Sequence, residues 1–272
     1  MSAVMSAGGA AWTNGMPRHG EAARASQRGL FLVAALLFVA SWAVTIAWCA
    51  SMSAMGEMAM PGGWAMSMAW MRMRDGTSLD VAAPLVGMWV VMMTAMMLPS
   101  LAPPLARERS ESRSTVVAAA AYLFVWAALG VVVVPLGIAF AAVVMQSPGT
   151  ARAVPIAVGL VVLLAGTFQF SKWKAHHLTC CRETHGSHPP PTDVRAAFGQ
   201  GLRLGLHCIH CCLGFVAMLL AFGLMDLRAM IVITAAITAE RLAPNGERAA
   251  RAIGAVVIAG GLILMARAVL LA

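Results

Sequence analysis

Thiol and imidazole side chains, which bind zinc and copper in proteins, are concentrated in two short stretches of the chain, "KAHHLTCC" and "LHCIHCC". The candidate metal ligands in these stretches are His176, His177, Cys180, Cys181, His207, Cys208, His210, Cys211 and Cys212. Five of the six cysteines and six of the seven histidines lie between Lys174 and Cys212, so chance is a poor explanation of the clustering. We therefore predict one soft-metal site with ligands from both stretches. The alternative is that the cysteines are small apolar packing residues.

Methionine supplies a second kind of soft donor, a neutral thioether that favours Cu(I). Eight methionines lie in residues 51–75, where Met52, Met55 and Met58 are spaced three apart and would share one face of a helix. Five more follow two adjacent stripes of an expected helix, at Met88, Met92, Met93, Met96 and Met97. These positions form a candidate route for a metal ion. The alternative is that methionine is a flexible apolar filler, in an interfacial helix and in helix packing.

The spacing of Cys208 and Cys211, a C-x-x-C, also allows thiol–disulfide exchange. Cys180 and Cys181 would then be the resolving pair, and the protein would be a membrane thiol–disulfide oxidoreductase. The predicted topology places all four thiols on the cytoplasmic side, where disulfides rarely persist. The sequence therefore favours a metal-binding protein that is not an enzyme.

Two charged residues, Glu240 and Arg241, follow an apolar stretch directly. Charged groups at membrane depth are costly and usually have a partner. We predict that these two side chains pair with each other at the inner interface, in preference to a role for Glu240 in proton coupling.

The elements that must position these ligands are membrane helices. Hydrophobic residues make up 60% of the chain and charged residues only 11%, which is too apolar for an ordinary soluble domain. The apolar stretches predict an all-α, polytopic transmembrane helical bundle with about seven spans, near residues 30–50, 81–98, 114–145, 153–170, 206–223, 227–239 and 252–271. The sixth stretch is short, and if it is re-entrant the C-terminus changes side.

Lysine and arginine are more frequent in the segments that lie inside when the N-terminus is inside, which predicts that orientation. Residues 1–29 are then a disordered cytoplasmic tail and residues 30–272 a transmembrane helical domain. Within that domain, residues 51–75 form a Met-rich outer loop and residues 171–204 a Cys/His-rich inner loop. The net charge of +8 fits basic cytoplasmic loops, and no nucleic-acid-binding motif is present.

Four segments, "MWVVMMTAMMLPS", "KAHHLTCCR", "GLHCIHCCLGF" and "AITAER", resemble a bacterial family of predicted metal-binding integral membrane proteins, sometimes labelled copper chaperones. The resemblance covers about residues 30–271 and implies metal binding in the bacterial cytoplasmic (inner) membrane. The positions that match the family pattern are Trp89, Met92, Ala95, Met96, Met97, Pro99, Lys174, Cys180 or Cys181, Cys208, Cys211, Cys212 and Glu240. The chain departs from the pattern at Leu213 and Arg241, where the family has tryptophan and lysine, and His207 and His210 are additions.

These observations leave three hypotheses. The first is a membrane protein that binds a soft metal, Cu(I) with zinc as the alternative ion, and acts in its transport or delivery. The second is the thiol–disulfide oxidoreductase, and the third is an accessory factor for the assembly of a metalloenzyme. The expected partners are the lipid bilayer and either a metalloenzyme or a periplasmic metal carrier.

Overall fold

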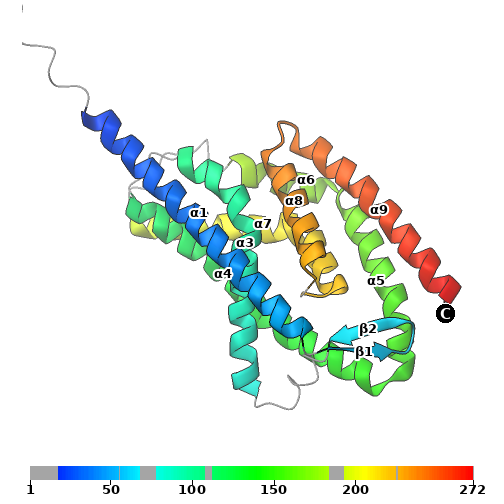
Figure 1. The fold of residues 1–272 in the computed structure, drawn as a ribbon. Helices are drawn as coiled ribbons and strands as arrows, with labels where there is room; N and C mark the ends of the chain where they lie inside the picture. Colours follow the sequence, from blue (N-terminus) through cyan, green and yellow to red (C-terminus); the bar gives the residue numbers. More distant parts are fainter. Residues whose placement is uncertain are drawn as a thin grey trace, which may run out of the picture.

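The computed structural model describes residues 18–54, 56–67, 78–107, 112–183, 193–224 and 226–271 of the 272-residue chain (Figure 1). Its elements, in chain order, are α1 (Arg18–Ser53), β1 (Glu57–Met60), β2 (Trp64–Ser67), α3 (Ser78–Arg107), α4 (Ser112–Gln146), α5 (Pro148–Phe168), α6 (Lys172–Glu183), α7 (Val194–Phe222), α8 (Leu227–Leu242) and α9 (Gly246–Leu271). Apart from one hairpin, the regular elements in these ranges are helices. The predicted all-α class is therefore confirmed.

Five helices contain segments that are long and apolar enough to cross a membrane: Phe31–Ser53, Arg113–Gln146, Pro148–Phe168, Val194–Phe222 and Gly246–Leu270. The apolar segment of α3 is shorter, at Ala83–Pro99, and α8 has only 16 residues. Large apolar side chains such as Leu32, Leu36 and Val256 are exposed on α1 and α9, as expected for lipid-facing surfaces. These features indicate a multi-pass membrane protein. The count of about seven spans and the inward N-terminus stay predictions.

Two segments that the sequence predicts to be irregular are partly helical. Residues 18–29, predicted to belong to a disordered tail, form the start of α1, and residues 1–17 lie outside the described residues. The predicted inner loop, residues 171–204, contains α6 and the first turns of α7. The ligands on α6 therefore have a helical periodicity, and this decides which of them face α7.

The Met-rich outer segment is not one helix. Met52 lies near the end of α1 and Met58 lies on β1, so the predicted shared helical face is wrong, and Met55 is outside the described residues. The chain reverses at Gly62 and Gly63, whose φ angles of 102° and 76° suit glycine and start a hairpin instead. Trp64 Nε1 donates a hydrogen bond to the carbonyl oxygen of Ala151 (2.9 Å), which ties the hairpin to α5.

Helix α7 lies at the centre of the packing, and more than half of its most apolar window is buried. The most extensive helix contacts join α4 to α7 and α5 to α9, and α6 and α8 also pack on α7 (Figure 1). A glycine permits the close approach of α4, since a Cβ atom on Gly201 would lie 2.2 Å from the carbonyl oxygen of Ala118. This contact fixes the position of the α7 segment that carries the candidate ligands.

The α4–α7 contact gives a testable prediction. We expect Gly201→Ala to destabilise the protein by about 1–3 kcal/mol, because the new methyl group meets backbone that cannot rotate away. Gly199→Ala is the matched control, because no atom lies within 4 Å of its Cβ position and alanine is the better helix former. Thermal unfolding of the two purified variants measures the difference. Equal melting temperatures would contradict the proposed helix contact.

Candidate metal centre

Four cysteines from α6 and α7 form a buried group, here called the thiol cluster: Cys181, Cys208, Cys211 and Cys212. Their exposed fractions are 5%, 0%, 3% and 2%. Cys211 Sγ lies 3.8 Å from Cys181 Sγ and 3.7 Å from Cys212 Sγ. Two thiolates bound to one tetrahedral ion at the usual metal–sulfur bond length are about 3.8 Å apart. The sulfur atoms therefore have the spacing of ligands that share an ion.

A cationic nitrogen already lies among these sulfurs. Arg241 Nη2 is 2.7 Å from Cys208 Sγ, 3.7 Å from Cys211 Sγ and 3.9 Å from Cys181 Sγ. Within the described part of the chain, no three His, Cys, Asp or Glu side chains are arranged so that they could hold an ion as they stand. An ion can enter the thiol cluster only if the guanidinium moves aside.

The helical phase of α6 and α7 explains why these thiols meet. His177 and Cys181 are four residues apart on α6, and His207 and Cys211 are four residues apart on α7, so each pair lies on one helix face. The two pairs meet where α6 packs on α7. His177 Nδ1 lies 2.9 Å from His207 Nδ1, and Cys181 Sγ lies 3.8 Å from Cys211 Sγ. An imidazole pair and a thiol pair therefore lie side by side where α6 packs on α7.

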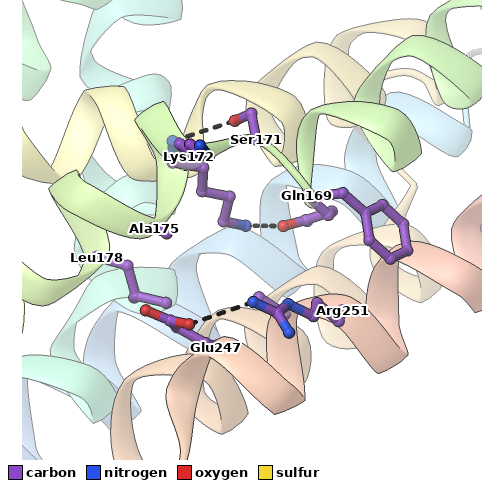
Figure 2. Close-up of a pocket in the computed structure, with 10 residues that line it drawn as sticks. Gln169, Ser171, Lys172, Ala175, Leu178, Glu247 and Arg251 are labelled. Carbon is purple, nitrogen blue, oxygen red and sulfur yellow. Dashed lines mark hydrogen bonds and ion pairs between the residues drawn. The ribbon is translucent and has the colours of Figure 1, made fainter.

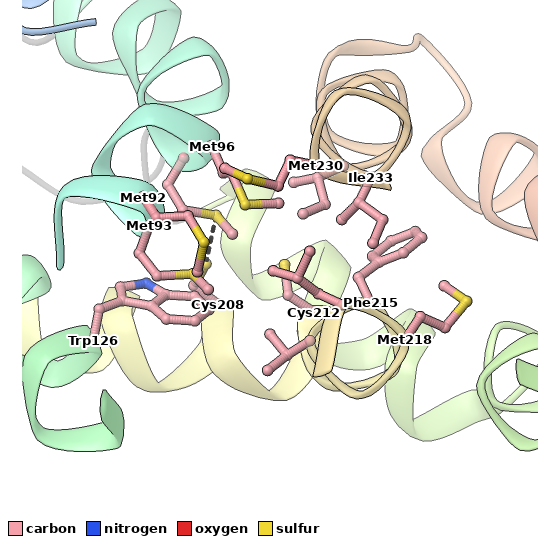
Figure 3. Packing of buried hydrophobic residues seen from close by; sticks show 14 of the residues in the cluster. Met92, Met93, Met96, Trp126, Cys208, Cys212, Phe215, Met218, Met230 and Ile233 are labelled. Carbon is pink, nitrogen blue, oxygen red and sulfur yellow. Dashed lines mark hydrogen bonds between the residues drawn. The ribbon is translucent and has the colours of Figure 1, made fainter. Parts of the chain in front are cut away.

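Helices α3 and α4 close the other side of the thiol cluster. Met97 Sδ lies 3.9 Å from Cys208 Sγ, and the Tyr122 hydroxyl lies 3.0 Å from the same sulfur. Figure 3 shows other α3 methionines directed into the interior that Cys208 and Cys212 also line. All five stripe methionines, Met88, Met92, Met93, Met96 and Met97, are buried. The structure therefore brings one thioether of the stripe to the thiol cluster and packs the stripe in the core.

The imidazoles form a separate group beside the thiol cluster. The rings of His177 and His210 are stacked with centroids 4.8 Å apart, and His210 Nδ1 donates to the carbonyl oxygen of Leu206 (2.7 Å). Cys180 is not in the thiol cluster, because it points to His176, whose Nε2 lies 3.7 Å from its sulfur. The predicted single site is thus two neighbouring groups. The remaining two histidines of this region, His185 and His188, lie outside the described residues.

Two groups on α6, His177 and Cys181, have shifted pKa values. Burial and the neighbouring imidazoles of His210, His207 and His176 lower the pKa of His177 below its ordinary value, so its ring stays neutral to lower pH. The hydrogen bond with Cys211, together with burial, raises the pKa of the Cys181 thiol well above its ordinary value. A bound cation would oppose the second shift, because it stabilises the thiolate.

The predicted mutual pair of Glu240 and Arg241 is replaced by partners on other helices. Lys174 Nζ lies 2.8 Å from Glu240 Oε2 and 3.0 Å from Oε1, and both side chains are almost completely buried. Lys174 also donates to Gln169 Oε1 and lies over the Phe215 ring, 4.5 Å from its centroid. Arg241 turns to the thiols instead. Glu240 and Arg241, which are adjacent on α8, therefore contact different groups: Glu240 contacts the buried Lys174, and Arg241 contacts the thiol cluster.

The buried Lys174–Glu240 pair lies beside a small cavity of about 190 Å³ at the junction of α5, α6 and α9 (Figure 2). Gln169, which shares Lys174 with Glu240, lines this cavity. Sequence reasoning missed Gln169 and Tyr122. Each is a polar side chain inside an apolar stretch, and that isolation is a signal that could have found them.

Comparison with known proteins supports a metal-related role. The model of the family described as PpoB2, copper chaperone, matches residues 86–264. This range contains the thiol cluster, the imidazoles and the α3 methionines. No curated protein and no solved structure matches the chain.

Proposed function

Because the chain belongs to the PpoB2 copper-chaperone family, we propose that it binds Cu(I) in the thiol cluster and delivers or transports it within the bacterial cytoplasmic membrane. The observation that carries this proposal is the group of four buried thiols, in which Cys211 Sγ lies 3.7–3.8 Å from two other sulfurs and Arg241 Nη2 lies within 3.9 Å of three of the four. Packing alone does not explain this group, because apolar packing does not require a guanidinium cation in contact with the thiol sulfurs. In this proposal, copper is the cargo.

The donor set favours Cu(I) over zinc. Thiolate and thioether sulfur are soft ligands that suit Cu(I), and a thioether sulfur, Met97 Sδ, lies 3.9 Å from Cys208 Sγ. A thioether adds little to a zinc site. Metal analysis of the protein after growth in copper tests this choice, and zinc alone in the purified protein would contradict it.

Charge balance assigns a role to Arg241. A monovalent copper ion held by two thiolates carries one net negative charge, which is costly to bury without a partner. The entering ion takes the place of Nη2, and the long arginine side chain lets the guanidinium move to the edge of the thiol cluster. There it neutralises the complex and stabilises it.

The α3 methionines extend the proposed copper route away from the thiol cluster. Met88, Met92, Met93 and Met96 precede Met97 along α3, so they extend from the thiol cluster as a line of thioethers. Neutral thioethers bind Cu(I) without releasing protons and allow exchange between neighbouring sites. Met52, near the end of α1, and Met58, on β1, would be the first sites to contact copper at the outer side of the membrane. The recipient of the copper would be a metalloenzyme or a periplasmic metal carrier.

The structure disfavours the oxidoreductase hypothesis. A thiol that exchanges disulfides with a protein must be accessible to that protein. Cys208 and Cys211 are 0% and 3% exposed and lie in the middle of α7.

Two adjacent cysteines provide the experiment that tests the proposed function. Cys181 lies in the thiol cluster, whereas Cys180 lies outside it. We expect Cys181→Ser to weaken Cu(I) binding roughly tenfold or more, because a ligand is lost. Competition with a chromophoric Cu(I) chelator, performed without oxygen on the purified protein, measures the affinity.

Cys180→Ser is the matched control, because it removes the same atom from the same turn of α6. It should leave the Cu(I) affinity unchanged. An unchanged Cu(I) affinity in both variants would contradict a site built on Cys181, and an equal loss in both would indicate a site at the surface.

A further inference from the structure

Three histidines lie close together outside the thiol cluster. We name this group, His177, His207 and His210, the imidazole cluster. All three side chains are half-buried, and they meet where α6 packs on α7. The Nδ1 atoms of His177 and His207 are 2.9 Å apart, and His210 stacks on His177. The Trp173 ring packs edge-on against His177 and His210, with centroids 4.6 and 5.0 Å away, and so holds these two rings in place.

The nitrogen spacing is close to that of two ligands of one metal ion. Because metal–nitrogen bonds are about 2.0–2.1 Å long, two imidazole nitrogens bound next to each other are about 2.9 Å apart on a square-planar ion such as Cu²⁺ and about 3.3 Å apart on a tetrahedral ion such as Zn²⁺. The shorter distance also fits an ordinary N–H···N hydrogen bond, which an entering ion would replace. The measured distance of 2.9 Å is therefore short enough for both nitrogens to bind one ion without movement of α6 or α7.

His210 is oriented as metal-bound histidines are. Its Nδ1–H donates to the carbonyl oxygen of Leu206 (2.7 Å), which leaves Nε2 as the acceptor nitrogen. In metal sites, a ligating histidine almost always donates its other ring N–H in this way. Its ring now stacks on His177 with centroids 4.8 Å apart, so it must tilt out of the stack to complete the ligand set.

We propose that the imidazole cluster binds one divalent first-row cation, of the Zn²⁺ or Cu²⁺ class, at a site separate from the thiol cluster. Neutral imidazole nitrogen suits these ions, whereas Mg²⁺ and Ca²⁺ require oxygen ligands. The site goes beyond the proposed function and does not depend on it. The chain then holds two ions of different charge and softness, in neighbouring sites between α6 and α7.

Titration with Co²⁺, followed by its absorption spectrum, tests this site. Co²⁺ is a spectroscopic stand-in for Zn²⁺ and shows intense charge-transfer absorption only when thiolates bind it. We expect one Co²⁺ to bind without that absorption and to be displaced by Zn²⁺. His177→Gln and His207→Gln should each weaken Co²⁺ binding roughly tenfold or more, because each removes a ligand.

His176→Gln is the matched control, because His176 is exposed on the same turn of α6 and faces Cys180. It should leave Co²⁺ binding unchanged. Cu(I) affinity, measured in all three variants, should also stay unchanged, and this separates the site from the thiol cluster. If either ligand variant fails to fold, as shown by its melting temperature, His210→Gln provides the same test.

Two results would overturn the proposal. One is an unchanged Co²⁺ affinity in the folded His177 and His207 variants, which would leave these rings with only a hydrogen-bonding role. The other is thiolate charge-transfer absorption from the first equivalent of Co²⁺, which would place the divalent ion in the thiol cluster. Neither result bears on Cu(I) binding, so the proposed function is tested independently.

Discussion

Replacing Glu240 with alanine is expected to destabilise the folded protein by about 3–5 kcal/mol, because it leaves a buried ammonium group without its carboxylate. Lys174 Nζ lies 2.8 Å from Glu240 Oε2, and the two side chains are 1% and 4% exposed. The lysine keeps two weaker contacts, with Gln169 and the Phe215 ring, which place the expected cost towards the lower end of this range. Thermal or denaturant unfolding in detergent measures it.

A double replacement, Lys174→Met with Glu240→Leu, separates the charge from the packing. It removes both charges at similar volume and should recover most of the lost stability, as buried pairs replaced by apolar residues commonly do. If the single and double variants are equally unstable, the pair is not the cause. If Glu240→Ala alone is as stable as the natural protein, water reaches Lys174 and the pair is not buried.

Replacing Arg241 with glutamine is expected to weaken Cu(I) binding about 10–100-fold, as removal of a group in contact with the ligands commonly does. Arg241 Nη2 lies 2.7 Å from Cys208 Sγ, and its positive charge balances the anionic copper–thiolate complex. Glutamine keeps hydrogen-bonding capacity but has no charge. The competition assay with a Cu(I) chelator measures the affinity.

Arg241→Lys is the control for this prediction, since it retains the charge without the planar guanidinium. It should recover part of the lost affinity, and added salt should change the result little because the group is partly buried. A rise in affinity on replacement with glutamine would show that the guanidinium mainly competes with the ion. The proposed charge balance would then be wrong.

Much of the fold follows from the sequence, because long apolar stretches can only be membrane or core helices. The predicted spans coincide with α1, α3, α4, α5, α7, α8 and α9. Helix α6 was missed, since it is short and polar and a search for apolar runs cannot find it. The hairpin was missed because eight methionines resemble an interfacial helix, although Gly62 and Gly63 mark the turn.

The candidate site was predicted in composition and not in arrangement. The clustering of thiols identified two segments whose cysteines the structure brings together, but Cys180 and Cys181 are chemically identical in the sequence. Only the helical phase of α6 distinguishes them, because Cys181 follows His177 by four residues on the face towards α7. The partner of Glu240 could not be found either, since Lys174 is 66 residues away and Arg241 is adjacent. Consecutive residues on a helix point in different directions, so adjacency was misleading.

The contact between Tyr122 and the thiol cluster gives the chain a reporter of its own. Tyr122 is the single tyrosine of the sequence, and its hydroxyl lies 3.0 Å from Cys208 Sγ. Isotope-labelled tyrosine would therefore give one resonance in a nuclear magnetic resonance spectrum, without any substitution. Its chemical shift would follow the occupancy of the thiol cluster directly, in detergent or in a lipid nanodisc.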